Sequence, residues 1–118
     1  MKTLVLGAST NPMRYSFLAI NKLLSHGHEV AAIGLKKGYV NHVEVQTEQI
    51  PFEGIDTVTL YLNPANQLPY YDYIPSLKPR RVIFNPGTEN PELIEILKNY
   101  QIKAEIACTL VLLSTNQY

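Results

Sequence analysis

The stretch Thr3-Leu4-Val5-Leu6-Gly7-Ala8-Ser9-Thr10-Asn11-Pro12 decides the fold of this protein. Its first part, Thr3 to Leu6, is a short apolar run, which is typical of a strand buried on both faces of a parallel sheet. Gly7 ends the run and a polar turn follows it. Four apolar residues then recur at helical spacing: Phe17, Ile20, Leu23 and Leu24. The N-terminal segment therefore predicts a strand, a turn and a helix in that order.

The rest of the chain repeats this alternation. Gly27 is placed to end the first helix, and Asn90 followed by Pro91 is a strong signal for the start of another. We expect further strands at 29–33, 43–46 (a short edge strand), 55–62, 81–84 and 102–107, and further helices at 67–75 and from 91 to about 100. Residues 38–42 are expected to form a loop, residues 47–51 a helical turn at most, and residues 109–118 either a strand or a helix.

This pattern predicts an α/β protein with a Rossmann-like three-layer fold. The sheet is expected to have about five mostly parallel strands in the order 3-2-1-4-5, with helices on both faces. The length of 118 residues suits one domain, and no linker or repeat divides it, so residues 1–118 are interpreted as a single domain.

Composition excludes several classes of protein. The chain is 46% hydrophobic and 17% charged, which is enough to bury a core. Ten basic and ten acidic residues give no net charge, which argues against a general nucleic-acid binder. Cys108 is the one cysteine, so an internal disulfide framework or a multi-cysteine metal site is excluded. Without a signal peptide or a membrane-length apolar stretch, the sequence predicts a cytoplasmic protein with no membrane partner.

Four loops should meet at the carboxyl edge of such a sheet, where ligands bind at the point of strand reversal. They are Gly7 to Arg14, Gly34 to Gly38, Leu62 to Pro64 and Asn85 to Gly87. The first joins a strand to a helix N-terminus, which favours an anion through free N–H groups and the helix dipole. Gly7 allows close approach of a ligand, and Arg14 supplies a fork that matches phosphate. The alternative is a plain turn, since the full dinucleotide fingerprint is absent.

The second loop is informative because it lacks an acidic residue. A site for NAD usually has Asp or Glu after the second strand, whereas this chain has Lys36 and Lys37. Two ammonium groups favour a phosphorylated ribose, as in NADP or coenzyme A, although a solvated pair of surface lysines would give the same sequence. In the last two loops, Asn63 and Asn85 either offer amide groups to a ligand or serve only the turns.

The motif Gly7-Ala8-Ser9-x-Asn11-Pro12-x-Arg14 resembles the opening of the small stand-alone CoA-binding-domain family. The members of this family are relatives of the CoA-binding Rossmann domain of succinyl-CoA synthetase. The resemblance continues through residues 26–30, 55–58 and 63–64 to Cys108. It implies that coenzyme A binds at the same sheet edge, on these residues: Gly7, Ala8, Ser9, Thr10, Asn11, Arg14, Lys36, Leu62, Asn63, Pro64, Asn85, Pro86 and Gly87. Lys37 is added as a candidate because of its charge and its place in the second loop.

No residue forms a recognisable catalytic or metal-binding motif. His26, His28 and His42 are interpreted as surface or helix-end residues, and Cys108 as a small buried residue, with a mixed disulfide to the CoA thiol as the alternative. The sequence therefore favours a module that binds coenzyme A or an acyl-CoA without catalysis of its own. Two alternatives remain open: an NADP-binding module of an oxidoreductase, and an interaction protein that kept the fold and lost the ligand.

Tyrosines cluster in one segment of the chain. Tyr70, Tyr71 and Tyr73 lie close together, with Tyr61 a little earlier. If a helix exposed two or three of these rings, they would suit a homodimer face. The alternative is ordinary packing of amphipathic rings at the margin of the core.

Overall fold

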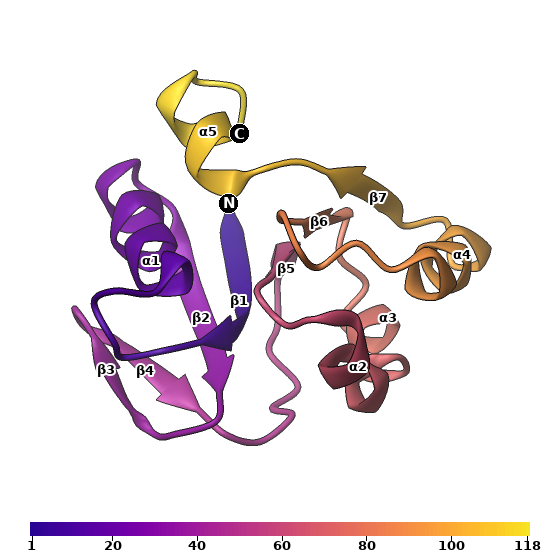
Figure 1. The fold of residues 1–118 in the computed structure, drawn as a ribbon, viewed down its shortest axis with the longest axis horizontal. Coiled ribbons are helices and arrows are strands. Elements are labelled where there is room, and N and C mark those ends of the chain that lie inside the picture. Colours follow the sequence, from indigo (N-terminus) through magenta and orange to yellow (C-terminus); the bar gives the residue numbers. More distant parts are fainter.

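The computed structural model describes residues 1–118, which form a seven-stranded sheet covered by helices on both faces (Figure 1). The elements follow in this order: β1 (Lys2–Ala8), α1 (Tyr15–Ser25), β2 (Glu29–Gly34), β3 (Gly38–Val40), β4 (Val43–Gln46), β5 (Ile55–Leu60), α2 (Pro64–Gln67), the 3₁₀ helix η1 (Leu68–Tyr70), α3 (Tyr73–Ser76), β6 (Arg81–Phe84), α4 (Pro91–Asn99), β7 (Lys103–Ile106) and α5 (Thr109–Ser114).

The strand order is β3-β4-β2-β1-β5-β6-β7, and every pair is parallel except β3 with β4. The α/β fold class and the Rossmann-like arrangement are confirmed. The chain runs outward from β1 in one direction, to β2 and β4, and then reverses to β5, β6 and β7. The switch point therefore lies between β1 and β5, where the strand order changes direction.

The expected number of about five strands was too low. Residues 38–40 were expected to form a loop, but they pair antiparallel with β4 as a short hairpin. Asn41 makes the tight connection with a φ of 58°, a conformation that asparagine tolerates better than most residues. The edge position therefore belongs to β3, and β4 lies inside the sheet.

The single helix expected at 67–75 was also wrong. The chain instead forms three short pieces, α2, η1 and α3. Pro69 and Pro75 lack the N–H that a continuous helix would need, which accounts for the breaks. The start of α4 is as expected, since Asn90 Oδ1 accepts from the N–H groups of Glu92 at 3.1 Å and Leu93 at 3.3 Å. The ambiguous C-terminal segment begins with the helix α5.

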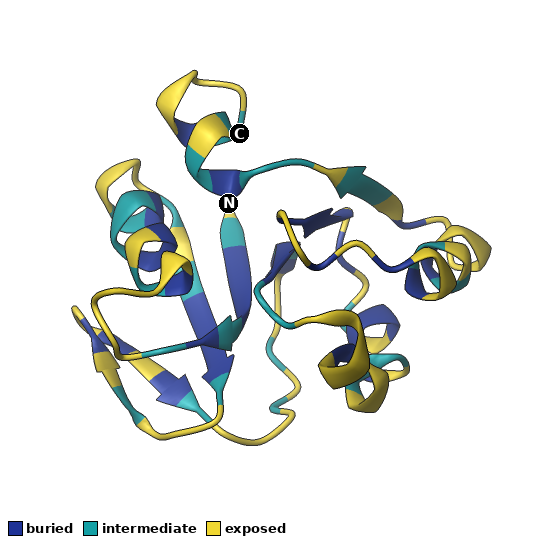
Figure 2. Ribbon diagram, viewed as in Figure 1, coloured by how far each residue is buried: buried dark blue, intermediate teal, exposed yellow.

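Two apolar clusters hold the layers together. Along β1 the side chains alternate, so Leu4 and Leu6 face one side of the sheet and Val5 the other. The larger cluster packs β1, β5 and β6 against α3 and α4, and the smaller one packs β1, β2 and β4 against α1 and α5. Figure 2 shows these strands as the buried centre of the molecule. No helix has the length and apolar character that crossing a membrane requires.

Candidate functional site

Three of the four predicted loops pack directly against each other at the carboxyl edge of the sheet. A β-carbon added at Gly34 would lie 2.1 Å from the carbonyl oxygen of Ala8, and one at Gly38 would lie 2.7 Å from Cγ2 of Thr10. The loop after β2 therefore lies on the loop after β1. On the other side, Gly7 has a φ of +98°, and its β-carbon would meet Cγ of Leu62 at 3.0 Å. Glycine is needed at Gly34 and Gly7 because another backbone segment approaches so closely, whereas Gly38 meets a side chain.

The loop after β1 is shaped by its own side chains. The Ser9 N–H donates to Ser16 Oγ at 3.1 Å, the Asn11 N–H donates to Ser9 Oγ at 3.1 Å, and the Met13 N–H donates to Asn11 Oδ1 at 3.0 Å. Ser16 is buried in the first turn of α1, so it fixes this loop to the helix. Two of the polar side chains that sequence suggested for ligand contact, Ser9 and Asn11, thus also set the local backbone conformation.

The N-terminus of α1 fits an anion. Its first turn contains no acidic residue, and Arg14 at the N-cap makes no side-chain cap. The N–H groups of Tyr15 and Ser16 have no acceptor within the protein. Unsatisfied N–H groups at a helix start carry a partial positive charge. The side chains of Arg14, Lys36 and Lys37 are exposed at the same edge, and neither loop contains an acidic residue. These features together suit a phosphate-bearing ligand.

Each of the first two loops also exposes a large apolar side chain. Met13 is 87% exposed and Leu35 is 93% exposed, although both residues are strongly hydrophobic. Neither side chain fills the space between the loops. They leave apolar surface next to the cationic residues, which is the combination that a nucleotide with an aromatic base requires.

The third loop, Leu62 to Pro64, was predicted to contact a ligand, and in the structure it also begins α2. Asn63 caps α2, because its Oδ1 accepts from the Asn66 N–H at 3.0 Å. The loop is also held by Gln67, whose Nε2 donates to the Leu62 and Thr88 carbonyls, each at 2.8 Å. Asn63 and Pro64 are exposed, while Leu62 packs on Gly7. The Nδ2 group of Asn63 remains free to donate outward.

Asn85 is buried, and both the amide nitrogen and the amide oxygen of its side chain form hydrogen bonds within the protein. Its Nδ2 donates to Thr59 Oγ1 at 2.6 Å and to the Leu60 carbonyl at 2.8 Å, and its Oδ1 accepts from the Thr109 N–H at 2.8 Å. Thr59 and Thr109 also share a hydrogen bond at 2.8 Å. All three residues are buried. We therefore assign Asn85 to the attachment of α5 and remove its amide from the candidate ligand contacts. Pro86 and Gly87, which follow it, are exposed.

Sequence reasoning missed Gln67, which ties the loop after β5 to the loop after β6. Besides its two donated bonds, its Oε1 accepts from Asn90 Nδ2 at 2.9 Å, and the side chain is fully buried. A glutamine within an expected helix carries no signal for such a role, because glutamine is a common surface residue in helices. The polar cluster around Asn85 was missed because an asparagine after a strand is common in turns and does not reveal that its side chain is buried.

Cys108 forms the N-cap of α5 and is partly buried. Its neighbour Tyr61 has a pKa raised to about 12, mainly by burial. No three side chains of His, Cys, Asp or Glu lie close enough together to hold a metal ion.

The clustered tyrosines pack against the core and do not form an exposed helix face. Tyr73 is buried, Tyr70 meets it edge-on at 6.0 Å between ring centroids, and the Tyr71 hydroxyl accepts from Asn90 Nδ2 at 2.9 Å. Burial also raises the pKa of Tyr73 to about 12. These contacts place the three rings at the margin of the core, in agreement with the alternative of ordinary packing considered from the sequence.

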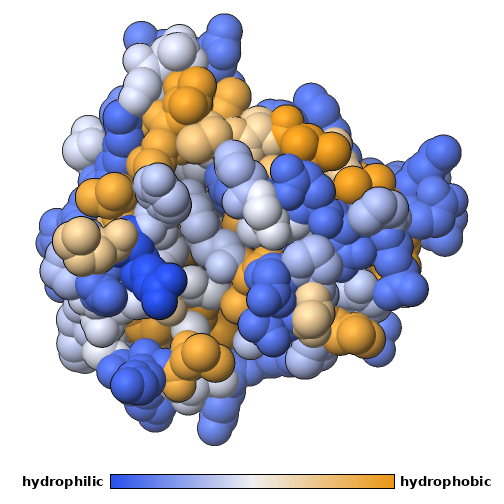
Figure 3. Space-filling model, in the orientation of Figure 1, coloured by the Kyte–Doolittle hydropathy of each residue, from blue (hydrophilic) through white to orange (hydrophobic).

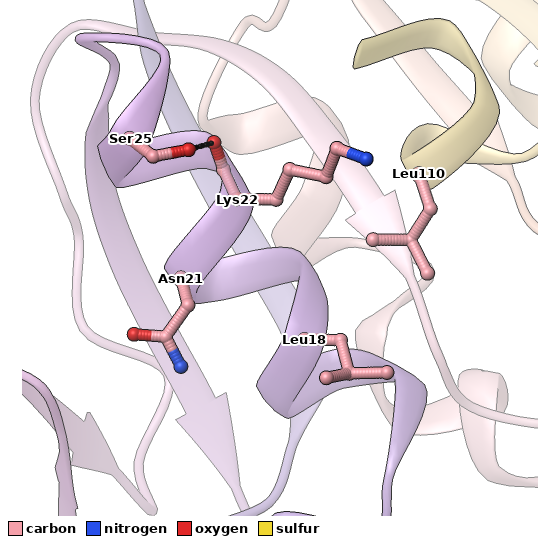
Figure 4. Close-up of a pocket in the computed structure, with 5 residues that line it drawn as sticks. All are labelled: Leu18, Asn21, Lys22, Ser25 and Leu110. Atoms are coloured by element: carbon pink, nitrogen blue, oxygen red, sulfur yellow. Dashed lines mark hydrogen bonds between the residues drawn. The ribbon is translucent and has the colours of Figure 1, made fainter. Parts of the chain in front are cut away.

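Two surface cavities lie away from these loops. Figure 4 shows a groove between α1 and α5, lined by Leu18, Asn21, Lys22, Ser25 and Leu110. Its one cation, Lys22, already donates to Ser114 Oγ on α5. The other cavity lies between the C-terminal ends of α3 and α4, and its lining includes Asp72, Lys78 and Tyr100. Neither cavity involves a residue predicted to bind ligand.

Comparisons with known proteins agree with this architecture. A family model described as a CoA binding domain matches residues 1–114. A crystal structure of an uncharacterized protein is 56% identical, with a TM-score of 0.96, over 99% of this chain and 97% of that one. No curated protein matched the sequence significantly.

More distant structures share the fold. A protein from Thermus thermophilus is 18% identical with a TM-score of 0.87, over 99% of this chain and 90% of that one. A dinucleotide-forming acetyl-coenzyme A synthetase from Candidatus Korarchaeum cryptofilum is 17% identical with a TM-score of 0.71. That match covers 92% of this chain but 25% of the synthetase.

Proposed function

Because this chain belongs to the CoA binding domain family, we propose that it binds coenzyme A or an acyl-CoA at the carboxyl edge of its sheet, without catalysis of its own. The single observation that carries the proposal is the packing of the loop after β2 on the loop after β1, through Gly34 on Ala8 and Gly38 on Thr10. This packing puts Lys36 and Lys37 on the same edge as the uncapped start of α1.

The loop after β1 would hold the diphosphate. Backbone N–H groups at the start of α1 would donate to it, and Arg14 would pair with it through its guanidinium group. Gly7, with its positive φ and no side chain, lets the loop after β1 lie directly against Tyr61 and Leu62 at the end of β5. Ala8, Ser9, Thr10 and Asn11 complete this loop, and the internal bonds of Ser9 and Asn11 hold it ready before ligand binds.

The lysines would take the 3′-phosphate of the ribose. Lys36 and Lys37 are exposed, and no acidic residue in their loop competes with a phosphate for them. Leu35 and Met13 would give the adenine ring its apolar contacts. The pantetheine arm would then cross the switch point toward Leu62, Asn63 and Pro64, with Pro86 and Gly87 at the far side.

Isothermal titration calorimetry with CoA, acetyl-CoA, 3′-dephospho-CoA and NADP tests this proposal. We expect heat and a thermal shift with both CoA forms, and weaker binding of dephospho-CoA because it lacks the phosphate assigned to the lysines. Absence of any response to CoA and acetyl-CoA at millimolar concentration would overturn the proposal. Tighter binding of NADP than of CoA would replace it with the dinucleotide alternative.

A further inference from the structure

The outer edge of β7 carries backbone groups that have no partner. β7 is the last strand of the sheet and pairs on one side only, with β6 (Figure 1). The Lys103 N–H donates to the Arg80 carbonyl at 3.3 Å, and the Ala107 N–H donates to the Phe84 carbonyl at 3.2 Å. Because backbone groups of alternate residues point to opposite sides of a strand, those of Ala104 and Ile106 point away from β6. Neither of these two N–H groups has an acceptor in the protein.

β7 is short and carries the charged residues Lys103 and Glu105, which are features that protect edge strands, but two other protective devices are absent. The strand contains no proline, and its register with β6 is unbroken by a bulge. Ile106 is 64% exposed at its end. Figure 3 shows hydrophobic residues gathered over α5 and beside β7. An edge of this kind is a template for a further strand.

The charges of β7 are complementary to those of a second copy. Lys103 and Glu105 flank Ala104 and project from the same face of the sheet. We propose that two copies of this chain pair antiparallel through β7, on a two-fold axis at Ala104. The two Ala104 residues then exchange both N–H···O=C bonds, and Lys103 of each copy lies opposite Glu105 of the other. Lys103 and Glu105 then form non-hydrogen-bonded pairs across the two strands, in which the opposed side chains are closest.

The charges also select this register over its neighbours. An axis at Glu105 would place two carboxylates opposite each other, and an axis at Lys103 would oppose two ammonium groups, both of which are unfavourable. The axis at Ala104 also places the exposed Ile106 at the backbone position opposite Ile102 of the second copy, a residue that is itself buried in the core of its own chain. Within each chain, Glu105 is held over the sheet by Arg81 at 3.6 Å and by Lys103 at 3.6 Å.

Sedimentation equilibrium of charge-exchange variants tests the proposal. We expect the wild type to be a dimer at low salt, and Lys103→Glu to raise its dissociation constant by about tenfold, because both cross-strand pairs become repulsive. Lys98→Glu on α4 makes the same charge change away from the edge and should leave the dimer intact. Ala104→Pro removes only an N–H that points outward, so it should abolish the dimer while circular dichroism shows a folded chain.

Mixing two variants gives the sharpest result. Lys103→Glu and Glu105→Lys should each dimerise poorly alone, yet form a heterodimer when mixed, because each carries the charges that the other lacks. Circular dichroism of Glu105→Lys is required first, since this variant loses the ion pair to the buried Arg81. A wild type that remains monomeric at all concentrations would overturn the proposal. A dimer insensitive to both Lys103→Glu and Ala104→Pro would overturn it as well.

Discussion

The α-carbon of Gly34 approaches the carbonyl oxygen of Ala8 so closely that a β-carbon on Gly34 would stand 2.1 Å from that oxygen. The two residues are register partners at the carboxyl ends of β2 and β1, directly after an irregularity in the pairing between Leu6 and Ala8. The irregularity brings the backbone of β1 over Gly34. This contact joins the two loops to which we assign the phosphates, so the proposed site would depend on a glycine that is not among the residues assigned to the ligand.

We therefore expect Gly34→Ala to destabilise the protein by about 1–3 kcal/mol, since the added methyl must displace backbone. It should also weaken CoA binding by separating the two loops. Urea unfolding and calorimetry measure the two effects. Gly27→Ala is the contrast: its site has a φ of +81° but no atom within 4 Å, so we expect a cost of about 1 kcal/mol from backbone strain alone and unchanged binding. Equal behaviour of the two variants would contradict the role given to the Ala8 contact.

The paired lysines should distinguish CoA from its dephosphorylated form. The double variant Lys36→Ala, Lys37→Ala is expected to weaken CoA binding by about tenfold and to leave 3′-dephospho-CoA nearly unaffected. Titration calorimetry of both ligands with both proteins gives the comparison. Lys98→Ala, on the exposed face of α4, is the matched control. If the double variant bound both ligands more weakly by the same factor, the lysines would not contact the 3′-phosphate.

Asn85 should matter for stability through α5. Asn85→Ala removes three hydrogen bonds and leaves the buried Thr109 N–H without its acceptor, so we expect a loss of about 2–3 kcal/mol. Asn63→Ala loses one exposed cap and should cost about 1 kcal/mol. Thermal unfolding measures both. A folded Asn85→Ala protein that binds CoA normally would agree with a structural role, and a stable protein with lost binding would contradict it.

His28 should make stability depend on pH. Its ring packs at a tilt of 58° against Tyr118, with 5.0 Å between ring centroids, and its Nδ1 is buried without a partner. Burial is the main cause of a pKa below the usual 6.5. The unfolded chain then binds a proton more readily than the folded one. The contribution of neutral His28 is therefore fully present above pH about 6.5 and is lost as the pH falls through the lower folded pKa. His28→Phe should flatten this part of the stability profile. NMR titration of the His28 ring that gave a pKa above 6.5 would refute the expectation.

Much of the fold followed from local patterns. The apolar run before Gly7, the spacing of Phe17, Ile20 and Leu23, and the Asn90-Pro91 start signal each depend on neighbours in the chain, so sequence could predict them. The β3 hairpin could not be predicted in this way. Tyr39 and Val40 favour strands, but a run of three residues that begins with glycine is too short to predict one, and it is the pairing with β4 that makes Gly38 to Val40 a strand.

The candidate site divides along the same line. Sequence indicated the loops that meet at the carboxyl edge, because in a parallel sheet strand order places the loops. It also supplied the cationic residues and the absence of acidic ones in the first two loops. It could not say that Asn85 would turn inward toward Thr109, because an exposed asparagine and a buried one have the same sequence context.

The sequence by itself determined the alternation of strands and helices, the chemical character of the edge loops and the family. The tertiary structure alone decided which side chains are free. Ser9 and Asn11 form hydrogen bonds within their own loop, and Gln67 and Asn85 form theirs in the interior. The backbone groups on the outer side of β7 remain unpaired. The physical reason is that hydrogen-bond partners are assigned by contacts between distant segments. A residue's identity fixes what it can donate or accept, and only the packed fold fixes what it meets.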